Sequence, residues 1–87
     1  MIIARFPKSQ LYDSSREIVQ FAALVGDKTV ACAISIEALH DHFDGDIQKP
    51  TETFIGNRVA IERIAERLIS RQRFEADGSI MIRTADC

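Results

Sequence analysis

The dipeptide Gly26-Asp27 constrains this chain more than any other feature, because it separates two runs that both have the composition of β-strands. These runs are residues 17–25 and 28–35. A glycine at the first position of a two-residue turn takes the positive φ of a type II′ turn, whose twist matches that of paired antiparallel strands. The sequence therefore predicts a β-hairpin from about Glu17 to Ser35.

The two-residue turn also fixes the register of the hairpin. It places Val25 opposite Lys28, and every second residue then falls on the same face. One face is wholly apolar, and we predict that it faces the core; its residues are Val19, Phe21, Ala23, Val30, Cys32 and Ile34. The reverse face is rich in small apolar residues, which we predict form an interface: Ile18, Ala22, Leu24, Ala31 and Ala33. Such a face is too apolar to be left in water, so either the chain or another molecule should cover it.

Elements on both sides of the hairpin complete the predicted order. Residues 2–6 form an apolar run stopped by Pro7, which suits the end of a first strand, and residues 8–15 are polar and predicted to be a loop. After the hairpin, Ser35 is a candidate N-cap for a helix that Gly45 would end.

A longer helix is predicted from Pro50-Thr51 to about Arg71, because apolar residues recur there with helical spacing. Residues 80–83 alternate and predict a last strand. The resulting order is β-β-β-α-α-β, and strands followed by helices favour an antiparallel β-sheet with two helices packed on one face. The prediction is a single α+β domain over residues 1–87.

Composition narrows the class of protein. The 87 residues suffice for one domain with a thin core, and a net charge of −2 gives the whole chain no general attraction to nucleic acid or to an acidic membrane. Two cysteines are too few for a disulfide scaffold of this size and fit a reducing compartment. The first residues lack the layout of a signal peptide, and no apolar run reaches the length of a membrane span. We therefore expect a cytoplasmic protein.

Several short motifs are distributed along the chain: Cys32-Ala33-Ile34-Ser35, Ile36-Glu37-Ala38-Leu39, Asn57-Arg58, Ile61-Glu62 and Asp77-Gly78. Together they resemble a family of small bacterial proteins of unknown function, the one numbered 1488, and the resemblance covers nearly the whole chain. It implies an α+β fold and a bacterial cytoplasmic setting. It implies no activity, and it carries over no catalytic residue.

The residues capable of chemistry do not form a recognisable constellation. On a helix His40 and His42 point to different sides, and the pairs His40/Asp44 and His42/Asp46 would each supply only two metal ligands. Cys32 falls on the core face, where a thiol behaves as a small apolar group. Phosphate-binding loops and nucleophile motifs are missing. We therefore predict no enzyme activity, no catalytic residue, no cofactor and no metal site.

Charge is distributed unevenly along the chain. Residues 35–53 carry five acids against Lys49 alone, and residues 58–73 carry five arginines against Glu62 and Glu66. Arg63, Arg67 and Arg71 recur at every fourth position, which marks them as candidate contacts for an anion or a partner. Arg58 and Glu62 have helical i, i+4 spacing; they form either an exposed pair or a buried anchor against the sheet.

These patterns favour a protein-interaction or self-associating module. In a twofold homodimer the basic surface of one copy would meet the acidic surface of the other. The alternative is a nucleic-acid-binding accessory protein that uses the Arg-rich face of the long helix. The acidic total, the single tyrosine and the absence of tryptophan argue against that alternative.

Overall fold

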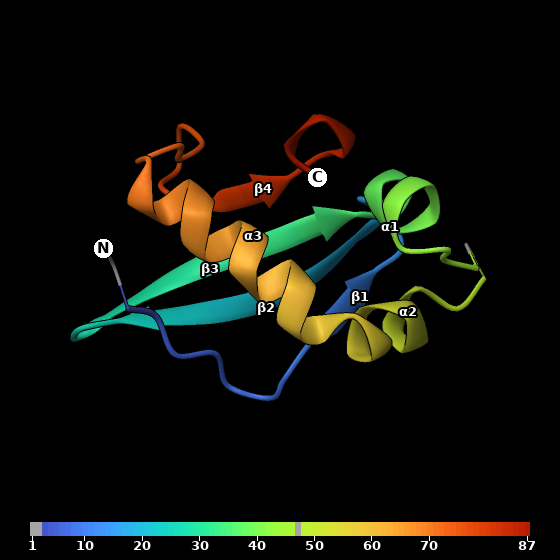
Figure 1. Ribbon diagram of the computed structural model, residues 1–87, viewed down its shortest axis with the longest axis horizontal. Helices are drawn as coiled ribbons and strands as arrows, with labels where there is room; N and C mark the ends of the chain where they lie inside the picture. Colours follow the sequence, from blue (N-terminus) through green and yellow to red (C-terminus); the bar gives the residue numbers. More distant parts are fainter. Residues whose placement is uncertain (1–2, 47) are drawn as a thin grey trace.

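A four-stranded sheet in the order β1-β2-β3-β4 forms one layer of the computed structural model, which describes residues 3–46 and 48–87. Its strands are β1 (Leu11–Asp13), β2 (Ile18–Val25), β3 (Lys28–Ser35) and β4 (Ile80–Ile82). The helices α1 (Ile36–His42), α2 (Pro50–Gly56) and α3 (Arg58–Ser70) lie between β3 and β4 in the chain, and a short 3-10 helix, η1 (Thr84–Asp86), follows β4. Figure 1 shows α3 crossing in front of the sheet.

The predicted hairpin and its register are confirmed. β2 and β3 pair antiparallel, with Val25 opposite Lys28 and Phe21 opposite Cys32. Gly26 has a φ of 62°, whereas Asp27 lies outside the left-handed region, as a type II′ turn requires. The turn chemistry and the period of two were therefore sufficient to place the strands.

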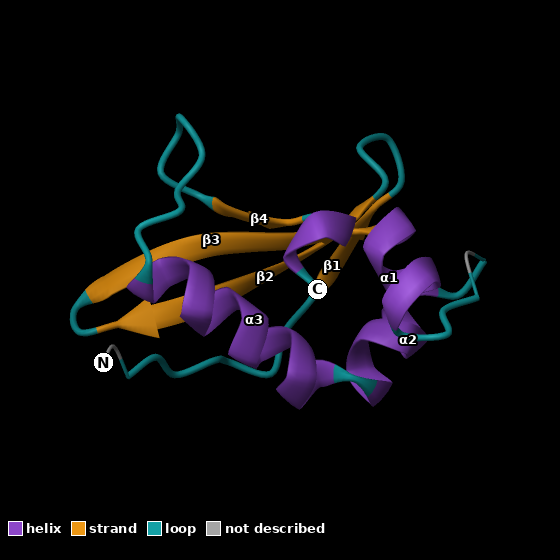
Figure 2. Cartoon of the chain, turned by 45° about the horizontal axis from the view of Figure 1, so that its top comes forward, coloured by secondary structure: helices purple, strands orange, loops and turns teal. Residues whose placement is uncertain are grey.

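The predicted core face of the hairpin packs against the helices. Val19, Ala23 and Ile34 have no exposed surface, and the ring of Phe21 lies 5.1 Å from that of Phe54 on α2. The same cluster contains the apolar side of α3 and both isoleucines of β4. All three helices thus contribute buried side chains to the core on one side of the sheet (Figure 2).

The first strand is not where the sequence predicted it. Before Pro7 the described residues contain only an isolated bridge between Arg5 and Leu24, and Ile2 lies outside the described residues. Pro7 has no N–H to donate, so pairing with β2 stops there. It resumes at Leu11, opposite Gln20, inside the stretch that was predicted to be a loop.

The sheet is mixed, which corrects the prediction of an antiparallel sheet. β4 pairs parallel to β3, with Ala33 opposite Met81. A parallel pair needs a connection that carries the chain back to the same end of the sheet, and α1, α2 and α3 provide it. Strand alternation marks a strand but carries no information about its direction.

The predicted long helix is two helices, so the fold contains three helices instead of two. Asn57 has φ −121° and ψ 19°, outside helical values, and its side-chain Nδ2 donates to the Thr53 carbonyl 2.9 Å away. The side-chain bond satisfies an end carbonyl of α2 and allows the chain to change direction. The apolar spacing continues across the break, because Phe54 and Ile61 are both fully buried.

Helix α1 begins at its predicted cap and ends for a different reason than expected. The Ser35 hydroxyl accepts from the Ala38 N–H at 3.1 Å. Beyond the helix, Asp44 takes the left-handed conformation with φ 51°, and the Gly45 N–H donates to the Leu39 carbonyl at 3.1 Å. A Cβ at position 45 would lie 2.8 Å from that carbonyl oxygen. Gly45 is therefore needed for a close backbone approach.

We predict that Gly45→Ala lowers the free energy of unfolding by about 1–3 kcal/mol, because the added methyl forces this backbone contact apart. Gly56→Ala is the matched control, since a Cβ there meets nothing within 4 Å. That change should be neutral or stabilising by up to about 1 kcal/mol, as expected for alanine in a helix. Urea unfolding of both variants measures the difference, and equal effects would contradict the prediction.

Candidate functional site

The face of the sheet opposite the helices presents apolar side chains that the fold leaves partly accessible. A row of register partners crosses it, one from each strand: Leu11, Gln20, Ala33 and Met81. Partners in register point to the same side of a sheet, so this row shares the face with the small residues of the hairpin. No helix among residues 3–46 and 48–87 lies on this side (Figures 1 and 2). We call this surface the reverse face.

The five residues predicted to form an interface differ in their exposure. Ile18 and Ala33 are 4% and 6% exposed, so the chain itself largely covers them. Ala22 and Leu24 are half-buried, and Ala31 is exposed. Leu11, which is 64% exposed, and Met81 extend the surface onto the outer strands. The sequence did not predict these two because it did not place β1 and β4 beside the hairpin.

A groove of about 210 Å³ lies on the reverse face. Its apolar lining includes Ala31, Ala33 and Met81, whose small or flexible side chains leave room above the sheet. Arg16, from the turn before β2, and Asp77, from the turn before β4, are its charged lining residues. The groove therefore combines an apolar surface with one cation and one anion.

Asp77 is held in place by its own turn. Its Oδ1 accepts hydrogen bonds from the Ser79 hydroxyl at 2.6 Å and from the Ser79 N–H at 3.0 Å. These bonds, together with the charge of Arg16, hold the pKa of Asp77 below its ordinary value. The carboxylate is thus ionised at neutral pH.

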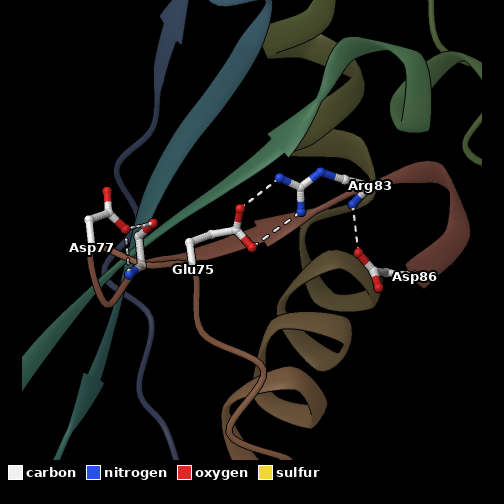
Figure 3. Close-up of polar contacts among 5 residues, drawn as sticks. Glu75, Asp77, Arg83 and Asp86 are labelled. Carbon is white, nitrogen blue, oxygen red and sulfur yellow. Dashed lines mark hydrogen bonds and ion pairs between the residues drawn. The ribbon is translucent and has the colours of Figure 1, made fainter.

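Residues on both sides of β4 anchor this part of the chain, as Figure 3 shows. Arg83 forms a two-pronged ion pair with Glu75, with an Nη2–Oε1 distance of 2.6 Å. The Asp86 carboxylate accepts from the Arg83 N–H at 2.9 Å and caps η1. These exposed contacts connect the segments on either side of β4, the strand that carries Met81 and follows the turn of Asp77.

Arg58 and Glu62 form an ion pair at the start of α3, with an Nη1–Oε2 distance of 3.8 Å. Their side chains are only 14% and 17% exposed, so the pair is largely buried. Arg58 also lies 5.0 Å over the ring of Phe54 and donates to the Gln10 side chain. Helical spacing predicted the pair, but the contact to Gln10 spans too much sequence to be predicted.

The arginines predicted to contact an anion or a partner are exposed, but one of them already bonds to another part of the protein. Arg63 and Arg67 lie on α3, and Arg71 is the C-cap of that helix. Arg67 donates to the Asp86 carbonyl at 2.9 Å, which ties α3 to η1. Glu66, between these arginines, accepts from the Ala4 N–H at 3.2 Å.

The residues considered for catalysis or metal binding are scattered. His40 Nδ1 lies 3.0 Å from the Gly45 carbonyl oxygen, so this ring nitrogen already has a hydrogen-bond partner at the end of α1. Within the described part of the chain, no three histidine, cysteine or acidic side chains are grouped to hold a metal ion. Cys32 is 3% exposed, and burial raises the pKa of its thiol to about 12. A thiol in that state is not a nucleophile at neutral pH.

We therefore predict that Cys32 reacts with a thiol reagent only when the protein unfolds. In the native protein near pH 8, the exposed Cys87 should react and Cys32 should not. A Cys87→Ser variant isolates the buried thiol, and its labelling rate should follow the rate of opening. Reaction of the native variant at the rate of a free thiol would contradict the buried position.

Glu62 yields a prediction about pH. Burial raises the pKa of its carboxyl above the ordinary value, and the charges of Arg58 and Lys8 oppose the shift. The folded state therefore binds the Glu62 proton more tightly than the unfolded state does. The protonated carboxyl stabilises the fold fully below the unfolded-state pKa, and this stabilisation is lost as the pH rises through the folded-state pKa. Glu62→Gln cannot titrate.

The unfolding free energy of the natural chain minus that of Glu62→Gln should consequently fall as the pH rises from about 4 to 7. Urea unfolding of both proteins across this pH range measures the difference in unfolding free energy. A difference that grows with pH would mean that attraction to Arg58 outweighs desolvation.

Together these features define a small α+β protein whose mixed four-stranded sheet has the described helices on one face. A family model described as a protein of unknown function, DUF1488, matches residues 4–82, and the chain belongs to this family. The resemblance found in the sequence is thus confirmed.

Two relatives share the size of the chain, and a solved structure shares its fold. The uncharacterized protein YrdB of Escherichia coli K12 is 33% identical over 79 residues, which cover 90% of this chain and 93% of the relative. The uncharacterized protein YrdB of Shigella flexneri is 32% identical over the same shares. A crystal structure of a DUF1488 family protein of unknown function from Shewanella loihica PV-4 has a TM-score of 0.81 and 22% identity, covering 91% of this chain and 90% of that one. That likeness shows the fold. No described helix is long and apolar enough to cross a membrane.

Proposed function

We propose that this protein is a self-associating interaction module in which two copies pack reverse face against reverse face. The observation that carries the proposal is the reverse face itself, an apolar surface across four strands without a covering helix in the described residues. Sheets pack face to face at about 10 Å, and small residues such as Ala22 and Ala31 allow that approach. Association would bury Leu11, Met81 and the partly exposed residues of the hairpin.

The charges of the groove support a second copy as the occupant. In a twofold interface, residue i of one copy contacts residue j of the other, and j contacts i. A surface with one cation and one anion is complementary to itself under that symmetry. Arg16 of one copy would face Asp77 of the other, and the reverse contact would form at the same time.

This arrangement replaces the pairing of acidic and basic surfaces that the sequence suggested. The acids of α1 and the arginines of α3 lie on the helix side of the sheet. They cannot meet each other in a dimer built through the reverse face. The proposal therefore assigns the contact to the sheet and leaves the helix side exposed to solvent or to other partners.

The proposal assigns binding, and not catalysis, to the chain, within the reducing cytoplasm that its two free cysteines suit. The nucleic-acid alternative has weaker support, because Arg67 is engaged by η1 and acidic residues interrupt the arginines of α3. A low-salt gel shift that disappears with Arg63→Glu and Arg71→Glu would favour that alternative.

We predict a dimer in analytical ultracentrifugation at tens of micromolar. Ala31→Arg should give monomers, because the large cation occupies the exposed centre of the interface. Arg16→Glu should weaken association about tenfold by placing two acids together. Asp77→Asn should weaken it less, since the amide oxygen can keep the hydrogen bonds of the turn.

Ala60→Arg is the matched control, because Ala60 is an exposed alanine on α3, away from the reverse face. This variant should dimerise like the natural chain. A strictly monomeric natural protein at these concentrations would overturn the proposal, as would a dimer that Ala31→Arg does not affect.

A further inference from the structure

We infer that a second surface, on the helix side, binds an acidic peptide segment of a partner protein that also carries aliphatic side chains. The surface is a hollow of about 700 Å³ between the N-terminal stretch and the α2–α3 junction. Lys8 and Gln10 line it from one side, and residues 55–60 line it from the other. In Figure 1 the N-terminal stretch passes below this junction. The inference does not depend on the proposed dimer, because the reverse face contributes nothing to the hollow.

The apolar part of the hollow comes from two large aliphatic side chains. Ile55, near the end of α2, is 51% exposed, and Val59, in the first turn of α3, is 61% exposed. Gly56 and Ala60 follow them in the chain and add almost no side-chain bulk. A partner can therefore reach both aliphatic groups, and their burial would supply the apolar part of the binding energy.

The polar part of the hollow is basic. Lys8 and Arg58 are the two charged residues in its lining, and both are cations. Arg58 is held in a fixed position, because it stacks over Phe54 at 5.0 Å and donates to the Gln10 side chain. A guanidinium that is already positioned loses little conformational freedom when it binds a carboxylate.

Arg58 also forms a buried contact with Glu62 beside the hollow. Its Nη1 and the Oε2 of Glu62 are buried without a hydrogen-bond partner, since the 3.8 Å between them is longer than a hydrogen bond. Unpartnered polar atoms are costly when they are buried. Because both atoms are buried, an incoming carboxylate cannot reach them, and the exposed Lys8 is the cation that it would contact directly.

The combination favours a peptide over other partners. An acidic residue beside a leucine, isoleucine or valine presents a carboxylate and an aliphatic group within one short segment, matching the two parts of the hollow. Single-stranded nucleic acid is disfavoured because the lining has no aromatic side chain on which bases could stack. The cations and the aliphatic side chains of the hollow thus both favour a short peptide segment with acidic and aliphatic residues.

Fluorescence anisotropy with a labelled short peptide of alternating leucine and glutamate tests the inference. We expect saturable binding that weakens about tenfold or more when glutamine replaces each glutamate, and that also weakens with salt. Lys8→Glu and Val59→Asp should each reduce affinity at least tenfold. Both residues are exposed, so neither change should unfold the protein.

Lys28→Glu is the matched control for charge, because Lys28 is an exposed lysine at the hairpin turn, remote from the hollow. It should leave the affinity unchanged. In amide NMR spectra the peptide should shift the signals of Ile55, Gly56 and Val59. The Ala31→Arg variant, designed to be monomeric, should bind equally well, which separates this inference from the proposed dimer.

Three results would overturn the inference. The first is no binding at millimolar peptide. The second is equal binding of the glutamine peptide or of the Lys8→Glu protein. The third is tighter binding of isovalerate than of the peptide at the same amide signals, which would identify a small carboxylic acid as the occupant.

Discussion

Burial of one face of the β2–β3 hairpin against the helices is the contact on which the rest of the structure depends. A two-stranded hairpin is marginally stable in water by itself. Here Phe21 meets Phe54, and Ile34 is fully enclosed, so the helices supply the apolar surface that the strands need. A chain of this length can build only a thin core. The described helices all pack on one side of the sheet, so no described helix covers the reverse face.

Much of the fold could be predicted because it is determined locally. Gly26-Asp27 specifies a turn type, the turn specifies the register, and Ser35 marks the start of α1. What could not be predicted depends on contacts between distant parts of the chain. The three-residue β1 becomes a strand only because Gln20 is available to pair with Leu11, and the direction of β4 depends on where the helices return the chain. The break at Asn57 was missed because the apolar spacing continues through it.

The candidate surfaces, too, combine features that are determined locally with contacts between distant parts of the chain. Alternation in the hairpin was enough to identify the small apolar residues of the reverse face. It did not reveal that Arg16 and Asp77 line one groove, since they are brought together by two turns that are far apart in the sequence. Likewise, the i, i+4 spacing predicted the pair of Arg58 and Glu62, whereas the positions of Gln10 and Lys8 beside it depend on the path of the N-terminal stretch.

The parallel pairing of β3 with β4 has a consequence for the order in which the chain folds. The hairpin needs only neighbouring residues, so its contacts are the fastest to form, including during synthesis. β4 can join only after the whole helical connection has been made, because closing a long loop is slow. Until then one edge of β3 offers unpaired backbone groups to any other strand. Pairing with Ile80–Ile82 therefore covers an edge of β3 that would otherwise be open to other strands.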